Sequence, residues 1–167
     1  FRTVDEMVGQ ADMLKIKEDL EHWKMKELNL YKILYKEPAA EGVGIYHQMD
    51  QAHELENILD WDLVKAAQPA LEYGENVKGE FKTLNINRSV GTLLSNEISK
   101  RYKGTGLPEG TIHFKFKGSA GQSFGAFGAP GIRFELEGEA NDYFGKGLSG
   151  GELIIYPDKS AKYKARD

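Results

Sequence analysis

The chain has 167 residues, of which 40% are hydrophobic and 29% charged, so it should fold as one domain or as a small domain with an arm. Its formal net charge of −4 gives no basic footprint for nucleic acid, and no run of about 18 apolar residues suits a membrane helix. We therefore expect neither nucleic acid nor a membrane as a partner. The absence of cysteine excludes a disulfide scaffold, a thiolate metal site and a cysteine nucleophile within these residues. The start at Phe1, with no basic or apolar leader pattern, is typical of a piece of a longer polypeptide.

The first part of the chain has helical periodicity. Apolar residues recur every three or four positions over 12–26, and a second helical stretch is predicted over 51–59. A third predicted helix begins near Asp62, is kinked or restarted by Pro69 and ends at Gly74.

A short strand and a further helix follow. Residues 81–87 alternate apolar and polar side chains, which predicts a strand. An apolar stripe from Val90 to Tyr102 predicts the helix, with Arg88 or Ser89 at its start and Gly104 just past its end.

The chain changes character near Gly104, because residues 1–103 hold 6 of the 19 glycines and residues 104–167 hold 13. Residues 112–118 lie 20 positions before residues 132–138 and match them in polarity, and residues 153–156 form a third copy. A short strand and glycine turns repeated at this period are typical of a solenoid. We therefore predict stacked parallel strands over 111–117, 132–137 and 152–157, with Phe114, Phe134 and Ile154 in one inward column.

The predicted fold class is mainly β with a helical amino-terminal part. We expect a right-handed parallel β-helix, a single-stranded solenoid that is only partly present, preceded by a helical arm. Residues 1–80 are assigned to the arm and residues 81–167 to the truncated start of the β-helix domain. The glycines assigned to its corners, in a structural role, are Gly118, Gly121, Gly125, Gly138, Gly145, Gly147, Gly150 and Gly151.

Two glycine motifs match catalytic patterns without the required context. Residues 121–125 read G-x-S-x-G, but a nucleophile elbow needs a helix after Ser123 and a later histidine, and the last histidine is His113. Residues 145–150 read G-x-G-x-x-G, but a strand rather than a helix is predicted to follow them. We interpret both as solenoid corners.

Two further patterns are interpreted as ordinary surface. Residues 113–117 interleave basic and aromatic side chains, as single-strand nucleic-acid platforms do, but the copy at 133–137 is not basic. Histidines and carboxylates gather at His47, Asp50, His53 and Glu54, and Glu18 lies four residues before His22, without a recognised ligand spacing. We accordingly assign no catalytic, cofactor-binding or metal-ligating residue.

Two glycine-rich runs, 118–127 and 137–151, resemble the carboxy-terminal glycine-rich (GXGXG) β-helix domain of the glutamate synthase large subunit. Residues 1–9 are similar to the segment that joins the FMN barrel of that family to this domain. Residues 87–92, Asn-Arg-Ser-Val-Gly-Thr, resemble the family's Asn/Asp-Arg-Thr-Val-Gly-Thr stretch.

The resemblance implies a cytoplasmic or plastid oxidoreductase that converts glutamine and 2-oxoglutarate to two glutamates in ammonia assimilation. It implies FMN and an iron–sulfur cluster in the parent enzyme and no cofactor in this piece. The role implied for this piece is structural and non-catalytic, packed between the amidotransferase and FMN domains. The electron donor is left open between NADPH, NADH and ferredoxin.

The sequence ends after about three of the predicted coils, whereas the family's solenoid has more. Residues 158–167 alternate like a strand just begun, so this open end is expected to pair with further chain in the intact enzyme. In the isolated chain we expect either self-association through this edge or fraying of residues 158–167. The alternative interpretation is a β-helix scaffold subunit of another multi-subunit oxidoreductase, such as formylmethanofuran dehydrogenase. A subunit of that kind has no reason to carry the linker-like residues 1–9.

Overall fold

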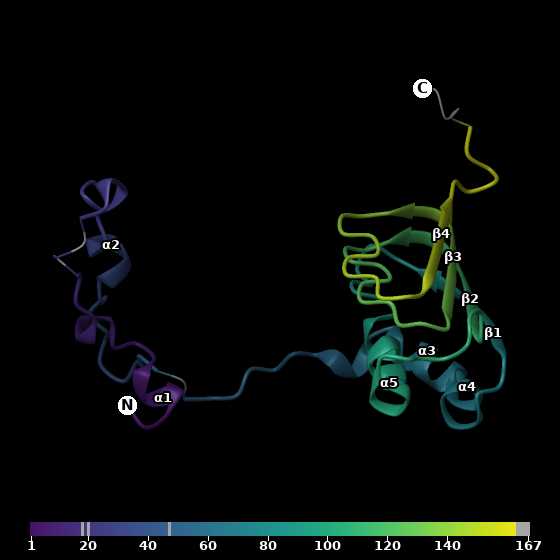
Figure 1. Ribbon diagram of the computed structural model, residues 1–167, viewed down its shortest axis with the longest axis horizontal. Helices are drawn as coiled ribbons and strands as arrows, with labels where there is room; N and C mark the ends of the chain where they lie inside the picture. The colour runs from purple at the N-terminus through teal and green to yellow at the C-terminus, as the bar shows by residue number, and fades with distance from the viewer. Residues whose placement is uncertain (18, 20, 47, 163–167) are drawn as a thin grey trace. The chain divides into compact units, whose positions relative to one another are not determined.

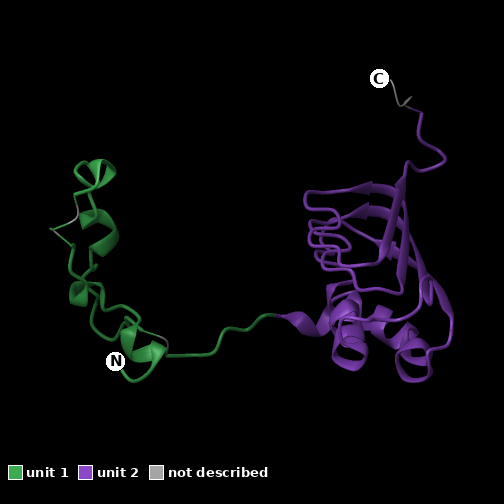
Figure 2. Cartoon of the chain, in the orientation of Figure 1, with its two compact units in different colours: residues 1–53 green, residues 54–167 purple. Residues whose placement is uncertain are grey.

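The structure, a computed structural model, describes residues 1–162 except 18, 20 and 47. The predicted strand start after Ser160 therefore lies in part outside the described residues, as do Glu18 and His47. The chain divides into two compact units, residues 1–53 and 54–167 (Figure 2).

The described residues of unit 1 form only short helices and no buried core. The helices are α1 (Val4–Met7), α2 (Tyr31–Leu34) and two 3-10 turns, Ala11–Met13 and Trp23–Met25. The continuous helix predicted over 12–26 is wrong, because its described middle residues are not helical. A helix stripe is stable mainly through the surface that it packs on, and no described residue of this unit is buried.

Unit 1 is therefore expected to contribute nothing to the stability of unit 2. Removing residues 1–53 should leave the Tm of the remaining chain unchanged. Limited proteolysis of the full chain should cut first within 1–53, because the described residues of this unit lack buried side chains. Calorimetry and mass spectrometry of the first fragments measure both. A Tm lowered by more than about 5 °C, which corresponds to roughly 1 kcal/mol, would contradict it.

Unit 2 begins with helices. In place of the helix predicted over 51–59 there is one 3-10 turn, Leu55–Asn57. The chain then forms α3 (Asp60–Ala66) and α4 (Gln68–Tyr73), with Pro69 in the first turn of α4 and Gly74 in the left-handed conformation (φ 70°) at its end. The predicted restart at Pro69 and the predicted glycine end are both confirmed. The helix predicted over 90–102 is α5 (Thr92–Tyr102).

Four parallel strands form one sheet in the order β1-β2-β3-β4 (Figure 1). They are β1 (Val77–Thr83), β2 (Ile112–Ala120), β3 (Ile132–Ala140) and β4 (Glu152–Tyr156). Strand β1 begins at Val77, four residues before the start of the strand predicted over 81–87. The 20-residue register between β2 and β3 is confirmed, with Phe114 opposite Phe134. The predicted partner at β4 is wrong by one position, because Leu153 and not Ile154 lies opposite Phe134.

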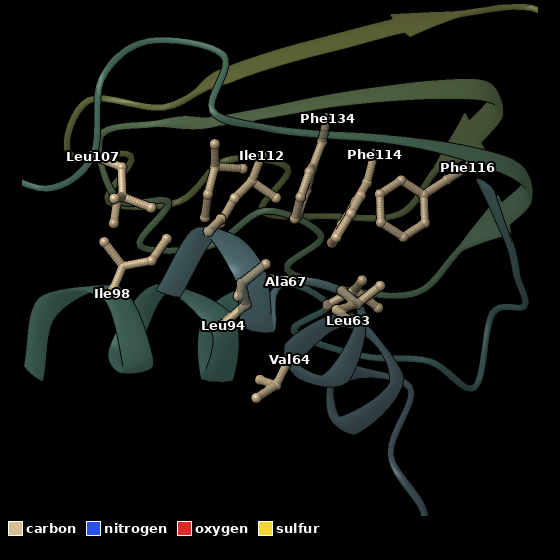
Figure 3. Close-up of a cluster of buried hydrophobic side chains, with 14 of the residues drawn as sticks. Leu63, Val64, Ala67, Leu94, Ile98, Leu107, Ile112, Phe114, Phe116 and Phe134 are labelled. Atoms are coloured by element: carbon tan, nitrogen blue, oxygen red, sulfur yellow. The ribbon is translucent and has the colours of Figure 1, made fainter. Parts of the chain in front are cut away.

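The core lies between one face of the sheet and the helices. Figure 3 shows Leu63 of α3, Ala67 just after that helix and Leu94 of α5 on the side of the sheet toward which Phe114 and Phe134 point. The rings of Phe114 and Phe134 stack at 6.1 Å between centroids, and both side chains are buried. Burying such an aromatic side chain stabilises the fold by about 1.5–3 kcal/mol.

The predicted right-handed parallel β-helix is wrong. The described strands belong to a single parallel sheet whose buried face is covered by helices, which is an α/β arrangement. The physical reason is the conformation of residues 121–131 and 141–151. These segments fold as tight turns and contribute no strand to a second sheet, so the inward side chains of the strands find their partners on α3 and α5.

Candidate functional site

The two glycine turns, residues 121–131 after β2 and 141–151 after β3, are the most distinctive feature of unit 2. They repeat the same backbone conformation 20 residues apart. Positive φ recurs at matching positions, at Ser123, Gly125 and Phe127 in the first turn and at Tyr143, Gly145 and Gly147 in the second, while Gly131 and Gly150 have positive φ without such a match. Backbone hydrogen bonds join the turns, from Ser123 N to the Asp142 carbonyl (2.8 Å) and from Phe127 N to the Lys146 carbonyl (2.8 Å).

The glycines assigned from the sequence lie where neighbouring backbone or side chains leave no room. A Cβ on Gly118 would lie 2.2 Å from the Thr83 carbonyl oxygen, and one on Gly138 would lie 2.0 Å from the Gly118 carbonyl oxygen. Six more show the same kind of close approach, with a neighbouring atom within 2.4–3.1 Å of the ideal Cβ: Gly121, Gly125, Gly145, Gly147, Gly150 and Gly151. Their absent side chains allow successive strands and turns to approach each other closely.

Neither catalytic glycine pattern is in the setting that its chemistry needs. Ser123 lies within the first glycine turn and has a positive φ of 66°. The elbow's helix is missing from residues 124–131, which the structure describes throughout as turn or irregular. The run at 145–150 leads into β4, so its amides do not open a helix. The turns in both cases connect strands.

The outer face of the sheet carries paired charges. His113 Nε2 lies 2.8 Å from Glu135 Oε1, and Arg133 Nη1 donates to Glu152 Oε2 at 2.6 Å. Burial opposes ionisation of Glu135, but hydrogen bonds from Arg133 and His113 hold its pKa below the ordinary value. Phe114 and Phe116 point into the core. The alternation of basic and aromatic residues in β2 therefore reflects a strand with its aromatic side chains in the core and its basic side chains on the outer face, as predicted.

Asp60 is a buried carboxylate, a kind of group often found at functional sites, and it was not identified from the sequence. Its carboxylate is 3% exposed and accepts hydrogen bonds from the backbone N–H of Gly91 (3.0 Å to each oxygen) and of Leu93 (2.8 Å). Burial raises the pKa of Asp60, while the N–H groups of Gly91, Leu93 and Leu94 act against this rise. The carboxylate therefore caps the start of α5 from another helix, which makes it a structural rather than a reactive group.

Asp158 fixes the turn that follows β4. Its carboxylate accepts hydrogen bonds from Ser160 N (2.7 Å) and Ser160 Oγ (2.5 Å), and Lys117 Nζ lies 3.3 Å away. Ser160 first, and Lys117 with it, lower the pKa of Asp158 from 3.8 to about 2.

A lowered carboxyl pKa stabilises the folded turn above the unfolded value, and the contribution is lost as pH falls through the folded value. The turn at 158–161 should therefore stay formed at neutral pH and open as pH falls from 3.8 toward about 2. An NMR titration of the Asp158 carboxyl, with the Ser160 amide as a second probe, measures this. The variant Asp158→Asn should show no transition of the Ser160 amide in that window, whereas a wild-type midpoint near 3.8 would contradict the assignment.

The described residues contain no group of three or more histidine, cysteine or carboxylate side chains able to hold a metal ion. Of the candidates from the sequence, Asp50, His53 and Glu54 are described and exposed, while His47 and Glu18 lie outside the described residues. No helix in the described part of the chain is long and apolar enough to cross a membrane.

Comparison with known proteins places these features in a family. The family model described as the GXGXG motif matches residues 60–167. Glutamate synthase [NADH] of Schizosaccharomyces pombe is 46% identical over 170 residues, which cover 100% of this chain and 8% of that protein. The glutamate synthase [NADPH] large chain of Bacillus subtilis is 46% identical over 157 residues, covering 93% of this chain and 10% of that protein.

A third relative is the chloroplastic ferredoxin-dependent glutamate synthase of Spinacia oleracea, 34% identical over 171 residues, covering 100% of this chain and 10% of that protein. The chain therefore spans about a tenth of the length of these relatives. The resemblance seen in the two glycine-rich runs is confirmed.

Proposed function

Because this chain belongs to the GXGXG motif family, we propose that it is the structural, non-catalytic domain of a glutamate synthase large chain. The observation that carries the proposal is the construction of the two glycine turns. Their glycines lie where a Cβ would meet neighbouring atoms, and their backbone groups bond to one another across the 20-residue repeat. The glycines at these positions therefore allow the turns to pack closely.

Polar side chains elsewhere in unit 2 are also held in hydrogen bonds within the domain. The buried carboxylate of Asp60 caps α5, and His113, Arg133 and Glu135 are joined in one network on the sheet. Groups held in internal pairs rigidify a domain and are not poised to accept or donate protons to a substrate. A rigid spacer is the role that such a domain supports best.

In this proposal the parent enzyme converts glutamine and 2-oxoglutarate to two glutamates, and its FMN and iron–sulfur cluster belong to other domains. The partners of this domain are the amidotransferase and FMN domains of the same polypeptide. Its compartment is the cytoplasm, or a plastid in a photosynthetic eukaryote, as the name of the Spinacia oleracea relative suggests for that case.

The proposal also covers the free edge of β4. Among the described residues β4 pairs with β3 only, so its other edge presents backbone N–H and C=O groups. We propose that this edge pairs with further chain of the same polypeptide in the intact enzyme. In the isolated chain it is available to a second copy.

Two experiments test the function. The purified chain should bind no FMN and should hydrolyse neither glutamine nor simple esters, because Asp60, His113, Arg133 and Glu135 are held in internal pairs. A stoichiometric flavin, or an esterase activity abolished by Ser123→Ala, would overturn the non-catalytic assignment.

The second experiment exchanges the matching segment of the Bacillus subtilis large chain for this chain. The resulting chimera should keep glutamine-dependent glutamate formation, because the two segments are 46% identical over 157 residues. A control chimera with a Gly/Ser linker of equal length should lose it. Equal activity of the linker chimera would refute the spacer role.

A further inference from the structure

Two exposed aromatic residues in the glycine turns have strained backbones. Phe127 (φ 56°) and Tyr143 (φ 61°) are non-glycine residues in the left-handed region, and their exposed fractions are 56% and 57%. A bulky side chain rarely adopts this conformation. Strain of this kind persists where another requirement outweighs it, and it concentrates at functional sites.

The internal repeat shows that the turn itself does not require these aromatics. The residue 20 positions after Phe127 is Gly147, which has the same left-handed conformation (φ 66°) without strain. The residue 20 positions before Tyr143 is Ser123 (φ 66°). Both turns therefore form with small residues at these positions, and the aromatic rings need a separate explanation.

Phe127 and Tyr143 are exposed on two adjoining turns, which the hydrogen bond from Phe127 N to the Lys146 carbonyl joins. A Cβ on Gly147 would lie 2.7 Å from the Phe127 ring, and one on Gly128 would lie 2.7 Å from Leu148 Cδ1, so Phe127 and Leu148 each cover a glycine of the other turn. Lys146 Nζ lies 4.6 Å from the centroid of the Tyr143 ring. We call these exposed side chains of the two turns, Phe127, Tyr143, Lys146 and Leu148, the aromatic tip.

We propose that the aromatic tip is the contact by which this domain binds another domain of the same polypeptide, on an apolar surface that bears a carboxylate facing Lys146. The proposal rests on the proposed function. The relatives are about ten times longer than this chain, so most of the surface available to the tip belongs to the rest of such a polypeptide. Aromatic residues are enriched at interfaces, and Tyr is among the residues that dominate interface energy.

The positive charge of Lys146 indicates which kind of partner surface the aromatic tip would bind. Within the described part of the chain, the Lys146 ammonium lies over an aromatic ring and pairs with no carboxylate. It is therefore available to an acidic group of the partner, whose approach would desolvate the cation and strengthen its contact with the Tyr143 ring.

Hydroxyl-radical footprinting of the isolated chain and of the Bacillus subtilis chimera tests the proposal. The reactivity of Phe127 and Tyr143 should fall several-fold in the chimera, while Tyr73, which is 74% exposed on α4, should stay equally reactive. Unchanged reactivity of Phe127 and Tyr143 in an active chimera would overturn the proposal and leave the proposed function standing. Protection that grows with concentration in the isolated chain would identify a second copy as the occupant and also overturn it. A folded chimera without activity would refute the proposed function and this proposal with it.

Variants that copy the internal repeat give a second readout. Phe127→Gly copies Gly147, and Tyr143→Ser copies Ser123. Both should leave the Tm of the isolated chain unchanged or raise it, and together they should lower the Tm of the chimera. If the two aromatic side chains had a purely structural role, the variants would lower the Tm of the isolated chain as much as that of the chimera.

Discussion

Replacing Gly138 by alanine is expected to destabilise unit 2 by about 4 kcal/mol, the sum of backbone strain and overpacking that each cost roughly 1–3 kcal/mol. Gly138 has a φ of 146°, and a Cβ there would lie 2.0 Å from the Gly118 carbonyl oxygen and 2.9 Å from its carbon. Both are backbone atoms of β2, so they move only if the β2–β3 pairing separates. Calorimetry should show a Tm lower by more than about 10 °C.

Gly110 provides the matched control, because it has a φ of 71° with no heavy atom within 4 Å of an added Cβ. Gly110→Ala therefore carries the cost of positive φ without a clash and should destabilise by only about 1 kcal/mol. If the two variants lose equal stability, the close approach of β2 and β3 at Gly138 is not what requires glycine.

Replacing Asp60 by alanine is expected to cost about 3 kcal/mol, because leaving buried N–H donors without an acceptor costs about 1–3 kcal/mol. The variant would remove the hydrogen-bond acceptor of Gly91 N and Leu93 N at the start of α5. The helix supplies the buried Leu94 and Ile98 to the core, so the loss should be seen as global unfolding. Urea denaturation followed by circular dichroism measures it.

Asp60→Asn keeps one acceptor oxygen and should lose clearly less than the alanine variant. Because the pKa of Asp60 is raised by burial, the folded state holds its proton more tightly than the unfolded state. Wild-type stability should accordingly decrease as pH rises from the unfolded value of 3.8 through the folded value, and the asparagine variant should lack this component. Equal losses for alanine and asparagine would show that Asp60 does not act through its hydrogen bonds.

The strand repeat was predictable because its signals are local. The alternation of Ile112 to Gly118 and its copy 20 residues later depend on side chains facing alternate sides of a strand, and both strands formed in that register. The restart at Pro69 and the end at Gly74 are likewise decided by the backbone limits of proline and glycine.

The features that could not be predicted depend on distant partners. The periodicity over 12–26 indicates a helix, but none of the residues of unit 1 that the structure describes is buried. The β-helix prediction failed because the pattern of one strand does not say whether its buried face will meet further sheets or the helices α3 and α5. The role of Asp60 lies in hydrogen bonds to residues 31 and 33 positions away, which no local pattern marks.

The Bacillus subtilis chimera, assayed for glutamate formed per glutamine consumed, tests the central claim most directly. If this chain is a rigid spacer between the amidotransferase and FMN domains, the chimera should form two glutamates for each glutamine. Gly138→Ala, which disturbs the β2–β3 pairing, should reduce that ratio and release free ammonia, while Gly110→Ala should not. A chimera whose ratio stays at two with Gly138→Ala, or with a Gly/Ser linker in place of this chain, would contradict the account.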